Sequence, residues 1–137
     1  MAYFSYSRFS EMEKSMFFHF QQMQSLLKSG QFSDVTLVVG PLEQKEKQEE
    51  FKVHRNLLSA FSPVFSAMFS HSDTKEALEK RVLIEDVSAE TMHRLLSFIY
   101  TAEVIFEKKE KTLLELLAAC DKVSLSLFTC FLEHFNN

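Results

Sequence analysis

Glycine and proline are scarce in this sequence of 137 residues, which contains only Gly30, Gly40, Pro41 and Pro63. Phosphate-binding loops, dinucleotide-binding turns and the nucleophile turn of hydrolases all need clustered glycines, because the backbone must turn sharply or approach a phosphate closely. The two glycines lie ten positions apart and form no such cluster. The sequence therefore excludes the common glycine-dependent nucleotide-binding and hydrolase motifs.

Positive charge and long apolar runs are also lacking. The formal net charge is −4 at pH 7, whereas a general nucleic-acid surface requires clustered lysine and arginine. No stretch reaches the roughly 18 apolar residues of a membrane span, and the start of the chain has no uninterrupted apolar segment typical of a secretory signal. We expect no nucleic-acid partner, no membrane partner, and a cytoplasmic or nuclear location.

Patterns for catalysis and metal binding are absent as well. Cys120 and Cys130 belong to no C-x-x-C motif, and no pair of the five histidines has zinc-ligand spacing. Glu85 and Asp86 are adjacent in a predicted strand, so their side chains point to opposite faces and cannot share a substrate. Both cysteines lie in apolar helical surroundings and are expected to be free, buried thiols of a reducing compartment. We expect no enzyme, no cofactor and no metal.

Phenylalanine is abundant, with 15 Phe against three Tyr and no Trp, in a chain that is 46% apolar and 25% charged. These proportions are those of a globular protein. The length corresponds to one domain, by the usual prior of roughly 100–200 residues. We expect residues 1–137 to form a single domain whose core is rich in rings that need no hydrogen-bond partner.

Residues 9–28 have the periodicity of an amphipathic helix, and Gly30 is expected to end it. Phe18 falls on nearly the opposite side from Met16, at about 100° per residue, with Phe17 between them. Phe18 is either part of a second apolar face that meets another subunit, or a single exposed ring. The main stripe recurs at steps of three and four and consists of Phe9, Met12, Met16, Phe20, Met23 and Leu27.

Strands and helices alternate in the rest of the chain. The β-branched run 34–39 predicts a strand, and the charged run 43–50 predicts the solvated tip of a hairpin. Ser62, followed by proline, and Ser88 are predicted helix caps. Together the elements indicate one compact α+β unit. Further strands are expected at 51–54, 81–85 and 104–106, and further helices at 56–61, 64–69, 89–100, 112–120 and 124–135.

Seven blocks of the sequence are recognisable together, at 32–39, 51–55, 57–60, 62–69, 82–87, 98–101 and 117–122. In this order and spacing, over about residues 15–135, they resemble the BTB/POZ domain. Several blocks, 62–69 above all, look closest to the kelch-type and speckle-type (MATH-linked) branches. The resemblance implies a small, mostly antiparallel sheet flanked by a cluster of helices, with an N-terminal dimerisation helix.

The resemblance also implies a homodimer, because in this family the helix before the first strand packs against its two-fold mate. An N-terminal strand is often exchanged between subunits. Residues 1–14 are then an N-terminal arm, in which residues 3–6 are candidates for the exchanged strand. A two-fold interface is self-complementary, so one apolar patch serves both subunits. The expected interface consists of Met16, Phe17, Phe18, Phe20, Met23 and Leu27.

Asp34 and Arg55 match a charged pair that the family carries near its dimer groove. Two roles are open for this pair. The two side chains satisfy each other, since a partly buried charge left alone is expensive, or they bind a ligand directly.

Many family members bind the N-terminal part of a cullin through the helix corresponding to 64–69 and the segment after it. The candidate cullin face here is Val64, Phe65, Met68, Phe69, His71 and Asp73. The sequence departs from the family where Asp73 or Thr74 occupies an expected apolar position. It departs again at Ala102, where relatives have glycine; if that turn requires a positive φ, alanine costs roughly 1 kcal/mol.

The resemblance favours an interaction module, namely the dimerising, cullin-recruiting part of a ubiquitin-ligase substrate adaptor. The alternative is the dimerising, corepressor-recruiting domain of a transcription regulator, for which the long first helix, the exchanged strand and the Asp34–Arg55 pair argue. Such domains usually accompany kelch repeats, zinc fingers or a MATH domain. The 137 residues are therefore either an excised domain or a stand-alone version.

Overall fold

The structure is a computed structural model that describes residues 2–70, 80–103, 109–126, 129 and 132–133, with side chains from residue 11 onward. The expected strand at 104–106 lies outside the described residues, as does half of the expected helix at 124–135. His71, Asp73 and Thr74 also lie outside them.

A three-stranded sheet lies at the centre of the fold, with β1 (Val35–Val39) between β2 (Glu49–Val53) and β3 (Arg81–Ile84). β1 pairs antiparallel with β2 and parallel with β3, so the sheet is mixed, which corrects the expectation of a mostly antiparallel one. Alternate residues of β1 are buried, as expected of a sheet with one face against the core. The α+β fold class is confirmed.

The charged run between β1 and β2 forms an exposed turn, as its composition predicted, with a short 3-10 helix η1 (Lys45–Lys47) at its centre. Gly40 leaves β1 with a φ of 131°, and a Cβ at this position would lie 2.8 Å from the Lys47 carbonyl oxygen. Glycine is therefore required where the hairpin closes.

Two short helices, α2 (Arg55–Phe61) and α3 (Pro63–Ser70), follow β2 and pack against each other. The predicted cap between them is confirmed, because the buried Ser62 hydroxyl accepts a hydrogen bond from the Phe65 N–H at 3.2 Å. The same hydroxyl donates to the carbonyl of Val123, so the junction of α2 and α3 is hydrogen-bonded to a segment about 60 residues later in the chain. A small side chain thus satisfies two buried backbone groups.

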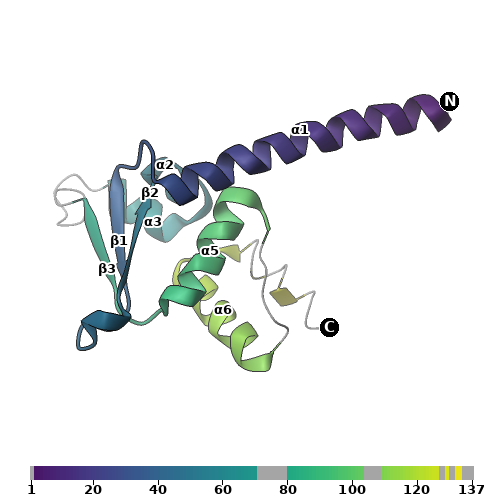
Figure 1. Cartoon of the computed structure of the whole chain (residues 1–137). Helices are drawn as coiled ribbons and strands as arrows, with labels where there is room; N and C mark the ends of the chain where they lie inside the picture. The colour runs from purple at the N-terminus through teal and green to yellow at the C-terminus, as the bar shows by residue number, and fades with distance from the viewer. Residues whose placement is uncertain (1, 71–79, 104–108, 127–128, 130–131, 134–137) are drawn as a thin grey trace.

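The helix pair α5 (Ala89–Thr101) and α6 (Glu110–Lys122) completes the described core. The predicted Ser88 cap is confirmed, since its side chain accepts from the Thr91 N–H. Figure 1 shows α5 beside the sheet, with α6 packed on its outer side. The buried row of α5 is the predicted one, Met92, Leu95, Leu96 and Ile99.

The first helix, α1 (Ala2–Ser29), is longer than the predicted 9–28. Residues 3–6, the candidates for an exchanged strand, are helical in this protomer, and their exchange between subunits stays a prediction. Gly30, with a φ of 66°, ends the helix as predicted. Only the C-terminal end of α1 packs on the body, against α5, and Figure 1 shows the rest running outward from it.

Ala102 ends α5 in the left-handed conformation, with φ 60° and ψ 14°, while its N–H donates to the Phe98 carbonyl. The turn therefore does require a positive φ. We expect Ala102→Gly to raise the free energy of unfolding by about 1 kcal/mol, measured by urea denaturation, because glycine adopts this conformation without steric cost. Ala118→Gly, on the exposed side of α6, is the matched control and should lower it by about 1 kcal/mol. Equal effects of the two changes would contradict this reasoning.

Candidate functional site

The outer part of α1 is an apolar surface that none of the residues described by the structure covers. Every residue from 11 to 19 is exposed. Phe18 is 62% exposed on the opposite side of the helix from Met16, which is 68% exposed. The Phe17 and Phe20 rings stack with their centroids 6.4 Å apart, so they form one continuous aromatic surface. Apolar side chains on both sides of a helix need cover from more than one direction.

The predicted interface residues divide into two groups along the helix. Met16, Phe17 and Phe18 lie on the outward part, whereas Phe20, Met23 and Leu27 are half-buried near the body. Met23 and Leu27 also pack against the core. Met23 and Leu27 therefore anchor α1 to the body, a role that the periodicity alone did not distinguish from surface contact.

A hollow of 480 Å³ lies on one side of the anchored end of α1. Met23 and Leu26 of α1, Leu57 of α2 and the ring of Phe32 supply its apolar lining, and it continues the apolar side of the outer helix. Sequence reasoning missed Leu26, Phe32 and Leu57. Leu26 follows Met23 at helical spacing, but Phe32 and Leu57 come from a turn and another helix, which no local periodicity relates.

Phe32 is the most unusual residue of this hollow. Its φ is 64°, a conformation that is an outlier for a bulky side chain, and the side chain is 81% exposed. The turn that holds it is closed by the Ser33 N–H donating to the Gly30 carbonyl. A strained backbone that presents an aromatic ring to solvent is more typical of a contact surface than of a structural turn.

His54 and Tyr100 form a buried polar network beneath the hollow. The His54 Nε2 lies 2.7 Å from the Gln31 carbonyl oxygen, which can only accept, so this nitrogen carries the proton. The Tyr100 hydroxyl accepts from the His54 backbone N–H at 3.0 Å and lies 2.6 Å from Nδ1. The phenol therefore donates to Nδ1, and a neutral imidazole satisfies every partner.

The phenol is held in its protonated form. Burial raises the pKa of Tyr100 from 10.0 to about 12, and the negative charge of Asp34 acts in the same direction, while the hydrogen bond from the His54 N–H opposes them. The O–H donor that the network needs is thus present throughout the physiological pH range. The network fixes the turn that carries Phe32 to the end of β2 and to α5.

Asp34 and Arg55 are brought together, as the sequence predicted. The Asp34 carboxylate accepts from the Arg55 backbone N–H at 2.8 Å and from its side-chain Nε at 3.3 Å. Asp34 caps the start of α2 through Arg55, and it also lines the hollow beside His54. The geometry favours the mutual-satisfaction reading of the pair over the ligand-binding one.

The candidate cullin face is described only in part. Phe65 is 2% exposed and stacks on Phe69 with ring centroids 5.8 Å apart, so it supports α3 from the core side. Val64, Met68 and Phe69 are half-buried and reach the surface. Of the predicted face, these three residues of α3 are the ones that are described and partly exposed.

Three further properties of the described part of the chain are the pKa of a buried thiol, the arrangement of possible metal ligands and the apolarity of the helices. Burial raises the pKa of the Cys120 thiol to about 12, so the thiolate is not formed at neutral pH. Among the described residues no cluster of three His, Cys, Asp or Glu side chains is arranged to hold a metal ion. Nor does any described helix combine the length and apolarity that crossing a membrane requires.

Comparison with known proteins identifies the family of the chain. The family model for the BTB/POZ domain matches residues 23–136. A similar curated protein is the BTB and MATH domain-containing protein 40 of Caenorhabditis elegans, 37% identical over 86 residues, which are 63% of this chain and 21% of that protein. The chain thus spans about a fifth of that relative's length. The relative belongs to the MATH-linked branch, to which the sequence blocks pointed.

A similar solved structure is the BTB domain of zebrafish PATZ1, with a TM-score of 0.67 at 21% identity. The superposition covers 85% of this chain and 86% of that one. At this sequence identity the similarity shows that the two chains share a fold. The chain therefore belongs to the BTB/POZ domain family, whose members are protein–protein interaction modules.

Proposed function

We propose that this chain is a homodimerising BTB/POZ domain and that α1 carries the two-fold contact. The observation that carries the proposal is the exposure of apolar side chains on the outer part of α1, from Met12 to Phe18. Contiguous exposed apolar surface of this kind marks an interaction site in a water-soluble domain. A two-fold axis lets a single patch of this type cover itself.

The dimensions of α1 support a second copy as the partner. Residues 2–19 of α1 extend about 27 Å at 1.5 Å per residue, which exceeds the radius of gyration of about 14 Å expected for a domain of this length. A helix of that reach can cross a two-fold axis and contact the body of its mate. The hollow with Phe32, beside the anchored end of α1, is an apolar surface on that body that such a contact could cover.

Sedimentation velocity of the full chain at micromolar concentration tests this proposal. We expect a species of twice the 16.0 kDa chain mass. A solitary 16.0 kDa species at tens of micromolar would refute the homodimer.

We further propose that the dimer serves as the cullin-recruiting part of a ubiquitin-ligase substrate adaptor. The 37% identity to a BTB and MATH domain-containing protein supports this branch of the family. The half-buried Val64, Met68 and Phe69 of α3 supply the apolar contact surface at the position that the resemblance implies.

Isothermal calorimetry against a cullin N-terminal fragment is the direct measurement, and we expect binding with a dissociation constant in the micromolar range or tighter. Met68→Asp should weaken it by at least about tenfold, because it places a charge on the apolar contact. Leu117→Asp, on α6, is the matched control, because Leu117 is half-buried against the core as Met68 is. Absence of heat at tens of micromolar would remove this role and leave the corepressor-binding alternative, whose argument is weakened because residues 3–6 are helical.

A further inference from the structure

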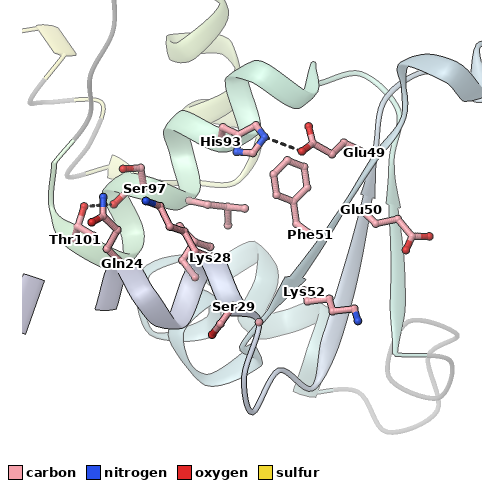
Figure 2. A pocket seen from close by; sticks show the side chains of 13 residues that line it. Gln24, Lys28, Ser29, Glu49, Glu50, Phe51, Lys52, His93, Ser97 and Thr101 are labelled. Atoms are coloured by element: carbon pink, nitrogen blue, oxygen red, sulfur yellow. Dashed lines mark hydrogen bonds and ion pairs between the residues drawn. The ribbon is translucent and has the colours of Figure 1, made fainter. Parts of the chain in front are cut away.

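A cleft of 660 Å³ lies on the side of α1 away from the hollow with Phe32. Its walls come from the C-terminal end of α1, the strand β2 and the helix α5, as Figure 2 shows. Gln24 and Lys28 of α1 line this cleft, whereas Met23 and Leu26 line the hollow, so the anchored helix separates the two. The volume falls in the range of roughly 300–1,000 Å³ that is typical of ligand sites.

The cleft runs along the free edge of β2. Four consecutive residues of the strand, from Glu49 to Lys52, line it, although neighbouring side chains of a strand point to opposite faces. A cleft can contact all four of these residues only if it runs along the edge of the strand, where both faces of the sheet are accessible. Gly30 closes one end of this edge, since a Cβ on it would lie 2.9 Å from the Lys52 Cβ.

The hydrogen bonds of β1 show which backbone groups face the cleft. The N–H groups of Thr36 and Gly40 donate to the β3 side, to Lys80 and Ile84. The odd-numbered residues of β1 therefore face β2, and the register pairs them with the odd-numbered residues of β2. The N–H and C=O of Glu50 consequently point to the open edge, where an extended chain can pair with them.

Side chains add an apolar floor and an uneven set of charges. Leu27, Phe51 and Leu96 form the floor, and the Phe51 ring meets the His93 ring edge-on at 4.6 Å. Glu49 accepts a hydrogen bond from the His93 Nε2 at 2.9 Å, which Figure 2 shows as a dashed line.

The two carboxylates of the cleft are thus engaged, because Glu50 forms an ion pair with Arg81 at 2.6 Å on the outer face of the sheet. Lys28 and Lys52 have no ion pair with any carboxylate in the part of the chain that the structure describes. Glu49 keeps its negative charge where His93 is neutral, but Lys28 and Lys52 outnumber it, so the cleft has a net positive charge that a ligand with carboxylates complements.

We propose that this cleft binds an extended acidic peptide segment of a partner protein. The peptide backbone pairs with Glu50 at the edge of β2, an apolar side chain rests on Leu27, Phe51 and Leu96, and flanking carboxylates contact Lys28 and Lys52. The site does not involve the outer part of α1, so it is independent of the proposed self-association.

Backbone amide chemical shifts of the full 137-residue chain, recorded with an acidic heptapeptide, test the proposal. The peptide is acetylated and amidated and alternates aspartate or glutamate with leucine and phenylalanine. A peptide with lysine in place of every acidic residue is the control. We expect saturable shifts at Lys28, Glu50, Phe51 and Leu96 with the acidic peptide, and at least roughly tenfold weaker binding of the basic one.

Charge-reversal variants distinguish direct contacts of the peptide with Lys28 and Lys52 from attraction by the net charge of the whole protein. The double variant Lys28→Glu/Lys52→Glu should bind the acidic peptide at least roughly tenfold more weakly. The control Lys45→Glu/Lys111→Glu changes the net charge equally at exposed positions that do not line the cleft, and it should bind within about twofold of the wild type. Both doubles should keep the sedimentation behaviour of the wild type.

Three results would overturn the proposal: no amide shift at millimolar peptide, shifts that saturate outside the cleft, or equal weakening in both double variants. Dilution without peptide is a fourth check. If the cleft amides shift on dilution, the occupant is a second copy of this chain and not an acidic peptide, whatever the outcome for the outer part of α1.

Discussion

Aspartate in place of Phe17 or of Phe18 is expected to raise the dissociation constant of the dimer by at least about 100-fold. Each ring is about 60% exposed in the protomer, at 60% and 62%, so neither contributes much to the stability of the isolated fold. Burial of a phenylalanine side chain stabilises an interface by about 1.5–3 kcal/mol, and an unpaired carboxylate in its place adds a desolvation cost. Sedimentation velocity should show monomers at concentrations at which the wild type is dimeric.

Leu114→Asp is the matched control for this experiment. Leu114 is 58% exposed on α6, so the change has the same chemistry at the same degree of exposure but away from α1. This variant should remain a dimer. If both Phe17→Asp and Phe18→Asp also sediment as clean dimers, the interface lies elsewhere.

Tyr100→Phe is expected to lower the free energy of unfolding by about 2 kcal/mol. The change removes one oxygen but leaves two buried groups of His54 without a partner, the backbone N–H and Nδ1. An unsatisfied buried polar group costs about 1–3 kcal/mol. Urea denaturation at one fixed protein concentration measures the loss without a contribution from a change in association.

A double-mutant cycle shows whether the loss of unfolding free energy in Tyr100→Phe comes from the interaction between the Tyr100 hydroxyl and the His54 imidazole. His54→Leu removes Nδ1, so Tyr100→Phe should cost less in that background than in the wild type by at least about 0.5 kcal/mol. Strict additivity would mean that the hydroxyl and the imidazole do not act together, which would contradict the network.

Local signals in the sequence were sufficient for much of the fold. The β-branched alternation predicted β1, and the serine residues at 62 and 88 predicted two helix starts that their hydrogen bonds confirm. The parallel pairing of β1 with β3 was not predictable in the same way, because it joins segments separated by more than 40 residues and depends on packing. The extension of α1 to Ala2 was missed since serine and aromatic residues are weak helix formers.

The candidate site was predictable only where one helix carries it. The stripe of α1 could be read from spacing, and the Asp34–Arg55 pair came from the family resemblance. Phe32 and Leu57 meet Met23 through a turn and a second helix, and the cleft along β2 has walls from three separate elements. Such surfaces are properties of tertiary packing, so no periodicity in a single segment reports them.

Among the described residues of this glycine-poor chain, four that carry side chains adopt left-handed backbone conformations, namely Phe32, Lys80, Ala102 and Ser124. Each costs on the order of 1–2 kcal/mol relative to glycine, whereas a whole domain is stable by only about 5–15 kcal/mol. Association with a second copy stabilises the folded state by mass action. The melting temperature should therefore climb with protein concentration, and the cellular abundance of the chain becomes a determinant of how much of it stays folded.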